Sequence, residues 1–203
     1  KLELIIEGGT YTEFPKSYLE TFHRDVFYSA NTFYDIEPKR QPLELEEEIC
    51  INKTTKVRII GICIETRPDA IDNDWIKFFR NTGTTRIQLG VQHTNNKLLK
   101  KINRGHTFEQ AVECIKYLKN NCFKVDIHLM PDLPGSTPEL DKEMFDIVYN
   151  SSIIQPDQTK IYPCEVVPWT VIKQWHESGK YTPYSDTDPK SLVDVITYAM
   201  TIC

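Results

Sequence analysis

Five turns along this chain carry residues that can bind a small charged ligand. Each turn follows an apolar run typical of a β-strand and precedes an amphipathic run typical of an α-helix. The turns span residues 8–10, 65–69, 90–93, 130–135 and 162–165. In a parallel β/α arrangement such turns lie at one edge of the sheet, beyond the carboxyl ends of the strands. That edge is therefore the predicted ligand site.

The first turn, Gly8-Gly9-Thr10, can bring bare backbone against a ligand. Glycine tolerates positive φ angles, and the exposed amides of such a turn can bind an anionic or polar group. A plain tight turn requires the same residues, so this motif alone does not identify a ligand.

Three side chains at the next two turns have suitable binding chemistry. Glu65 offers a carboxylate to an ammonium or a ribose hydroxyl, and Arg67 follows two residues later in an extended segment. Gln92 offers both a donor and an acceptor. The simpler interpretation is that Glu65 pairs with Arg67 and that Gln92 bonds to neighbouring backbone. The sequence leaves both interpretations open.

A group of basic residues is predicted to share one helix face, because Lys97, Lys100, Lys101 and Arg104 recur at spacings of three and four. The formal charge of the chain is −5, so a nucleic acid would have to bind through a local basic surface of this kind. We take this group as the candidate RNA-binding surface. The alternative is an ordinary solvated helix face.

His128 alternates with the apolar residues Ile127 and Leu129, so it faces away from them. Whether it lines the ligand site or an ordinary core is left open. Asp132 lies in a proline-rich turn, where it can cap backbone or contact a ligand. The five histidines show no H-x-x-x-H spacing and no cysteine at a zinc-like distance, and we assign no metal ligand.

The six cysteines are scattered without a C-x-x-C pair. This pattern favours free thiols in a reducing compartment, so a cytoplasmic location is expected. The sequence contains no apolar run long enough to cross a bilayer, and no membrane partner is expected.

Short apolar or β-branched runs predict five strands, and the periodic segments between them predict helices. The strands are expected at residues 2–6, 57–64, 86–89, 124–130 and 158–162. The helices are expected at residues 18–29, 74–81, 95–102, 107–119, 138–149, 170–178 and 189–202. Thr107 with Gln110, and Ser136 with Glu139, have the spacing of helix capping boxes.

Strands that alternate with helices at this spacing predict βαβ units, a parallel sheet and an α/β fold. Five strands make an incomplete barrel, whose closing strand we expect to precede Lys1. The 203 residues fit a single domain, 1–203. Residues 35–56 interrupt the pattern with an acidic segment, for which we expect a solvated loop or a short surface helix.

Several strings, taken together and in order, closely resemble the radical S-adenosylmethionine region of the catalytic-subunit family of Elongator. The likeness runs from Lys1 to about Ser185. The strings are KLELIIEGGT at 1–10, GICIETRPD at 61–69, TRIQLGVQ at 85–92, NRGHT at 103–107, HLMPDLP at 128–134, KIYP at 160–163 and WHESGKY at 175–181.

This resemblance implies a tRNA-modifying enzyme that builds a carboxymethyl group on carbon 5 of the wobble uridine. It implies S-adenosylmethionine, a 4Fe-4S cluster and acetyl-CoA as cofactors, with a 5′-deoxyadenosyl radical formed from S-adenosylmethionine. It implies tRNA and other Elongator subunits as partners. The expected fold is a partial (β/α) radical S-adenosylmethionine barrel without its first strand and cluster-binding loop.

The resemblance also implies residue roles. The glycine turn contacts the methionine part of S-adenosylmethionine, and Glu65, Gln92 and Arg104 match positions that hold this ligand in related porphyrinogen-oxidising enzymes. Lys1 matches a lysine linked to acetyl-CoA. His128 stands where those relatives carry an aspartate, so no role transfers to it. Taken with the turn chemistry, the predicted cofactor-binding residues are Gly8, Gly9, Thr10, Glu65, Arg67, Gln92, Arg104 and Lys1.

One departure from the family pattern limits these expectations. The family holds its cluster with three cysteines in a loop before the Gly-Gly-Thr strand, and this sequence contains no such loop. We therefore expect the cluster ligands to lie outside this chain and the isolated chain to be inactive, and we assign no catalytic residue. The alternatives are a non-catalytic RNA-binding or scaffold barrel, and another radical S-adenosylmethionine enzyme such as a porphyrinogen oxidase.

Overall fold

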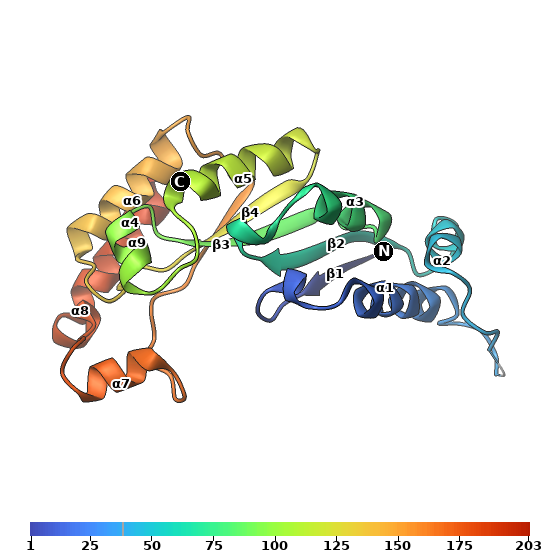
Figure 1. Cartoon of the computed structure of the whole chain (residues 1–203), viewed down its shortest axis with the longest axis horizontal. Coiled ribbons are helices and arrows are strands. Elements are labelled where there is room, and N and C mark those ends of the chain that lie inside the picture. The colour runs from blue at the N-terminus through green and yellow to red at the C-terminus, as the bar shows by residue number, and fades with distance from the viewer. Residues whose placement is uncertain (38) are drawn as a thin grey trace.

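The computed structural model describes residues 1–37 and 39–203 (Figure 1). Residue 38, which belongs to the acidic segment 35–56, lies outside the described residues. One sheet of five strands, in the order β1-β2-β3-β4-β5, organises the molecule, and each neighbouring pair is parallel. The strands are β1 Leu2–Ile6, β2 Ile59–Thr66, β3 Arg86–Gln92, β4 Lys124–Leu129 and β5 Gln158–Ile161. The predicted parallel α/β fold is confirmed.

The helices lie between and after the strands, and Figure 1 shows α6, α8 and α9 grouped at one end of the molecule with α1 and α2 at the other. The helices are α1 Lys16–Asn31, α2 Leu45–Asn52, α3 Asn73–Asn81, α4 Asn96–Lys101, α5 Phe108–Asn120, α6 Pro138–Asn150, α7 Val171–Glu177, α8 Tyr184–Thr187 and α9 Pro189–Ile202. Within the described residues, none combines the length and the apolar composition that a bilayer crossing requires.

The sheet is curled into a half-barrel. In a flat sheet, the outer two of five strands lie about 19 Å apart, because neighbouring strands are spaced by about 4.8 Å. Yet Nζ of Lys160 in β5 lies 3.4 Å from Oε1 of Glu7, the residue after β1. The carboxyl ends of the two edge strands must therefore bend toward each other.

The two faces of the curled sheet differ in polarity, as the two-residue period of a strand requires. On the helix-covered face, Ile62, Ile87 and Ile127 are fully buried in the hydrophobic core. The inner face carries polar side chains that contact one another across the strands, among them Glu65, Gln88, Asp126, His128 and Lys160. The inner face of the half-barrel is therefore polar and lies toward the predicted ligand site.

Of the two predicted capping boxes, only one forms. At the start of α5, Oγ1 of Thr107 accepts from the Gln110 amide, and the Gln110 side chain accepts from the Thr107 amide. The Ser136–Glu139 box is wrong, since Thr137 caps α6 by accepting from the Leu140 amide at 3.3 Å. The Ser136 hydroxyl instead donates to the buried carboxylate of Asp141.

The acidic segment contains helix α2, which begins with a capping box between Glu44 and Glu47. The expectation of a solvated segment is wrong for Glu48, which is 0% exposed. Its carboxylate accepts two hydrogen bonds from the guanidinium of Arg40, at 2.5 and 2.6 Å. A charge can be buried here because Arg40 neutralises it and further donors satisfy its oxygens.

Candidate functional site

The glycine turn lies at the carboxyl end of β1 with open space around it. Gly8 and Gly9 adopt φ angles of 117° and 82°, and a Cβ at either position would meet nothing within 4 Å. Two hydrogen bonds fix the residues that follow the turn. The Tyr11 hydroxyl donates to Nε2 of buried His23 at 2.7 Å, and the Thr12 hydroxyl bonds to that of Thr66 at 2.9 Å. Burial lowers the pKa of His23 to about 4, so its ring stays neutral and accepts this bond.

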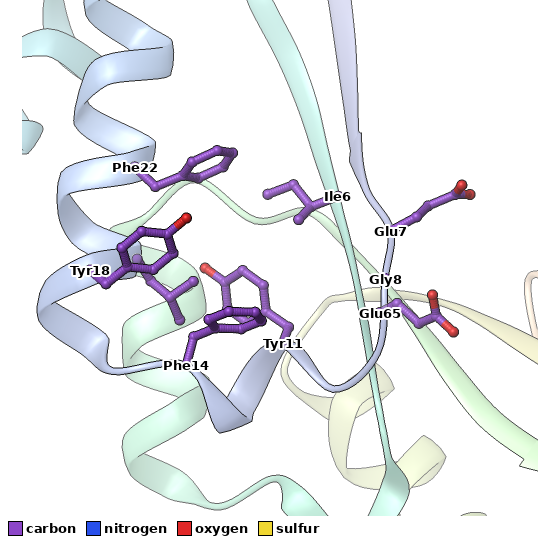
Figure 2. Close-up of a pocket in the computed structure, with 9 residues that line it drawn as sticks. Ile6, Glu7, Gly8, Tyr11, Phe14, Tyr18, Phe22 and Glu65 are labelled. Atoms are coloured by element: carbon purple, nitrogen blue, oxygen red, sulfur yellow. The ribbon is translucent and has the colours of Figure 1, made fainter. Parts of the chain in front are cut away.

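A pocket of about 120 Å³ opens beside this turn (Figure 2). Its lining residues are Ile6, Glu7, Gly8, Tyr11, Phe14, Tyr18, Leu19, Phe22 and Glu65. Figure 2 shows the aromatic rings on one side of strands β1 and β2, while the carboxylates of Glu7 and Glu65 point to the other side. Because sites for whole small molecules usually measure about 300–1,000 Å³, this pocket can take only part of a ligand.

Glu65 contacts His128 on the inner face rather than Arg67. Oε1 of Glu65 lies 3.4 Å from Nδ1 of His128, and the opposite ring nitrogen, Nε2, lies 3.0 Å from Oε1 of Gln88. His128 is only 7% exposed, and its ring meets that of Tyr162 edge-on. Burial lowers the pKa of His128, while the charge of Glu65 acts in the opposite direction. The face of His128, left open by the sequence, is thus the polar inner face.

The suggested pairing of Glu65 with Arg67 is wrong. The guanidinium of Arg67 forms an ion pair with Asp69, two residues further on in a 3₁₀ turn. Arg67 also lies against Gly105, where a Cβ would come within 2.8 Å of Nη2. Arg67 therefore packs between the turn at Asp69 and the loop at Gly105. The carboxylate of Glu65 points instead to the inner face, toward His128.

Gln92 and Arg104 come together around Gly90 at the end of β3. Nη2 of Arg104 donates to the Gly90 carbonyl at 2.6 Å, and Gln92 is held at a φ of 71°. Among the described residues, neither Oε1 of Gln92 nor Nε of Arg104, both buried, finds a hydrogen-bond partner. Burial and the nearby Arg67 lower the pKa of Arg104, whereas Asp69 and Glu65 act oppositely. An acceptor and a cationic donor are thus left unpaired, as expected where a polar ligand binds.

The predicted basic helix face is only partly correct. Lys97, Lys100 and Lys101 lie on α4 and are exposed, and no carboxylate of the described residues lies within ion-pair distance of them. Arg104 does not share their face, because α4 ends at Lys101 and Asn103 reverses the backbone with a φ of 58°. The chain then turns Arg104 inward to Gly90.

Two further predicted residues are not placed to contact a ligand at the carboxyl edge. Lys1 is exposed at the amino end of β1, about 20 Å from the glycine turn at the rise of an extended strand. Asp132 is buried and caps the start of α8, accepting from the amides of Tyr184 and Ser185 at 2.8 and 3.2 Å. Asp132 thus lies in the loop after β4, but its carboxylate caps α8 and is not open to a ligand.

Gln88 and Lys160 belong to the inner face but were not predicted. Nζ of Lys160 donates to Oε1 of Gln88 at 3.0 Å, so both side chains support His128. In the sequence, each is a polar residue inside a predicted strand. Only the strand register shows that Gln88 lies beside Glu65 and Lys160 beside His128, and hence that all four share one face.

A curled parallel sheet covered by helices defines a partial β/α barrel, a fold whose ligands usually bind at the carboxyl edge of the strands. The family model of the Radical SAM superfamily matches residues 19–147, and this chain belongs to that superfamily.

Relatives with specific names match over nearly the whole chain. The tRNA uridine(34) acetyltransferase of Methanocaldococcus infernus is 37% identical over 202 residues, which are 100% of this chain and 36% of that protein. Elongator complex protein 3 of Mus musculus is 33% identical, over 95% of this chain and 34% of that protein. The solved archaeal Elp3 of M. infernus superposes with a TM-score of 0.90 at 37% identity, covering 99% of this chain and 45% of that one. The chain thus spans about a third of the length of these curated relatives.

The residues at the carboxyl edge fit S-adenosylmethionine. Its carboxylate and ammonium match the unpaired Arg104 Nε and Gln92 Oε1, and the open glycine turn leaves backbone free for contact. They do not fit an iron–sulfur cluster. No group of three His, Cys, Asp or Glu within residues 1–37 and 39–203 is arranged to hold a metal ion, and burial raises the pKa of Cys63 to about 11, away from the thiolate form.

Proposed function

We propose that this chain is the barrel region of an enzyme that forms a carboxymethyl group on carbon 5 of the wobble uridine of tRNA, with acetyl-CoA as the source of that group. The names of the relatives support this proposal, since they specify tRNA uridine(34), acetyltransferase and Elongator. The proposal includes tRNA and other Elongator subunits as partners and a cytoplasmic location, in keeping with six free cysteines.

The observation that carries the proposal is the unpaired Gln92 and Arg104 at the same edge as the glycine turn. In this proposal Arg104 binds the carboxylate of S-adenosylmethionine, Gln92 and Glu65 accept from its cationic or hydroxyl groups, and the backbone of Gly8 and Gly9 lies against its methionine part. S-adenosylmethionine, when bound, supplies the radical chemistry of the superfamily. A link of Lys1 to acetyl-CoA, and a contact of Arg67 with the cofactor, stay predictions.

Substituting Gly90→Ala should weaken S-adenosylmethionine binding by about tenfold or more, because loss of a hydrogen bond to a charged group costs about 1.5–3 kcal/mol. The new Cβ would lie 2.8 Å from Nη2 of Arg104 and 3.1 Å from Nε2 of Gln92, so both side chains must move. Calorimetric titration of the wild-type chain and the variant measures the effect. Gly61→Ala, in β2 beside Thr85, is the control and should retain affinity. Equal affinities for wild type and Gly90→Ala would remove the basis for this site.

Reversing the charge of Lys97, Lys100 and Lys101 to glutamate together should reduce tRNA affinity by about tenfold or more at low salt. It should also flatten the dependence of affinity on salt, because fewer counterions are released from the phosphates. A filter-binding series over salt concentration measures both. A second triple on other helices, Lys77→Glu, Lys116→Glu and Lys190→Glu, makes the same change in net charge. If both triples weaken binding equally, α4 is not the RNA surface.

A non-catalytic RNA-binding or scaffold barrel is the second candidate, and it is favoured by the lack of cluster ligands among the described residues. We expect the isolated chain not to cleave S-adenosylmethionine after anaerobic reconstitution, with less than stoichiometric iron. Turnover by this chain would contradict that expectation. Cleavage of S-adenosylmethionine by a longer protein that contains this chain and matches its relatives in length would show that the protein is an enzyme. It would exclude a non-catalytic scaffold. The names of the relatives favour a tRNA-modifying enzyme over a porphyrinogen oxidase.

A further inference from the structure

His128 has acceptor oxygens facing both of its ring nitrogens. Oε1 of Gln88 lies 3.0 Å from Nε2, and Oε1 of Glu65 lies 3.4 Å from Nδ1. The orientation of the Gln88 amide is fixed independently, because Nζ of Lys160 lies 3.0 Å from the same Gln88 oxygen and an ammonium can only donate. Gln88 must therefore present its oxygen to the ring, and Nε2 of His128 must carry a proton and donate it.

Whether the remaining ring nitrogen, Nδ1, carries a proton then determines the net charge of His128 and Glu65 together. If Nε2 is protonated and Nδ1 is not, a lone pair faces the carboxylate of Glu65, and the two repel unless a proton lies between them. One proton shared by Nδ1 and Oε1 removes this repulsion. With this proton the pair of His128 and Glu65 carries no net charge.

We propose that His128 and Glu65 share one proton as a unit, and that His128 is a positioning residue whose protonation sets the charge that Glu65 offers to a cationic ligand group. The ligand half of this inference rests on the proposed function, in which Glu65 faces S-adenosylmethionine. An imidazolium beside Glu65 repels the sulfonium and ammonium of that ligand, so binding releases the proton. Affinity then rises with pH as His128 loses its proton.

The charged groups around His128 come from four elements. Glu65 on β2, Asp126 on β4 itself and Glu7 after β1 favour the imidazolium, whereas Lys160 on β5 opposes it. Burial opposes it most strongly and brings the pKa of His128 below the ordinary value of 6.5. The change in affinity is therefore expected on the acid side of neutrality. Lys160 also contacts Glu7, so its ammonium is held between the central strand β3, through Gln88, and the end of edge strand β1.

The first experiment measures S-adenosylmethionine affinity of the full chain between about pH 5 and pH 7.5. Wild-type affinity should rise by about tenfold over this range, the equivalent of one unit of pKa. His128→Gln keeps an amide that can donate to Gln88 but cannot titrate, so its affinity should be independent of pH. His176→Gln is the matched control, since His176 pairs with Asp186 on the surface at 3.1 Å, and it should retain the wild-type slope. A slope in His128→Gln equal to that of the wild type would overturn the proposal.

A second experiment needs no ligand. The titration of His128 is followed by NMR of histidine-labelled protein and assigned with His128→Gln. Glu65→Gln should lower the pKa of His128 by about one unit, because the carboxylate that stabilises the imidazolium is gone. An unchanged pKa would overturn the shared proton. Failure of the wild-type chain to bind S-adenosylmethionine would contradict the proposed function and the ligand half of the inference, and the NMR result would still decide whether the proton is shared.

Discussion

Asp141→Ala is expected to lower the free energy of unfolding by about 3–5 kcal/mol, the cost of leaving several buried donors without their shared acceptor. Asp141 is 0% exposed. Its Oδ2 accepts from the Asp132 amide at 2.7 Å and from the Tyr184 hydroxyl at 2.8 Å. Its Oδ1 accepts from the Ser136 hydroxyl and from Nε2 of His93 at 3.1 Å.

The loss should be measured by urea denaturation followed by circular dichroism. Asp141→Asn keeps one oxygen but presents donors in place of the other, so we expect an intermediate loss of about 2–3 kcal/mol. Glu143→Ala, an exposed acid two residues later on α6, is the control and should change the free energy by less than about 0.5 kcal/mol. A loss below about 1 kcal/mol for Asp141→Ala would show that the network does not stabilise the fold.

This network also explains how a chain segment remote in sequence reaches the ligand edge. Asp141 holds the loop that follows β4, and Asp132 of that loop caps α8. The Tyr181 hydroxyl donates to the Asp132 carbonyl from the same incoming segment. Breaking the network should therefore loosen residues 181–187 before it unfolds the sheet. Hydrogen exchange of the amides of Tyr184 and Ser185 would report this loosening.

The strands and the edge at which their turns meet could be predicted from the sequence, because both depend on local patterns. A run such as residues 124–129 alternates polar with apolar side chains, as is typical of a strand with two different faces. Parallel strands then bring their following turns together whatever the exact register. The helix cap at Thr107 was predictable for the same reason, since the two residues that form it lie three apart.

The partners within the site could not be predicted, because they depend on register and on single backbone reversals. Glu65 meets His128 only because β2, β3 and β4 are paired in one particular register. Arg104 left the basic helix face because Asn103 adopts a positive φ, a conformation that asparagine tolerates but does not require. Composition likewise gave no sign that Glu48, within an acidic run, would be buried.

Glu48→Ala is the second change with a large expected effect, a loss of about 2–4 kcal/mol in the free energy of unfolding. The carboxylate is buried and accepts from the Arg40 guanidinium, from the Leu43 amide at 2.9 Å and from the Asn31 side chain at 2.8 Å. Arg40 is about one third exposed, so water can partly solvate it when Glu48 is removed. Glu46→Ala, in the first turn of the same helix, is the exposed control.

The ion pair of Glu48 and Arg40 should also account for part of the loss of stability in acid. Hydrogen bonding to Arg40 is the main cause that lowers the pKa of Glu48 from 4.5 to about 2, while burial acts in the opposite direction. Because the unfolded chain binds this proton more readily than the folded one, the pair stabilises the fold above about pH 4.5, and this contribution is lost as the pH falls toward 2. Denaturation midpoints of wild type and Glu48→Gln should therefore differ most near neutrality and converge in acid. A difference that stays constant down to about pH 2 would mean that Glu48 acts by packing rather than by its charge.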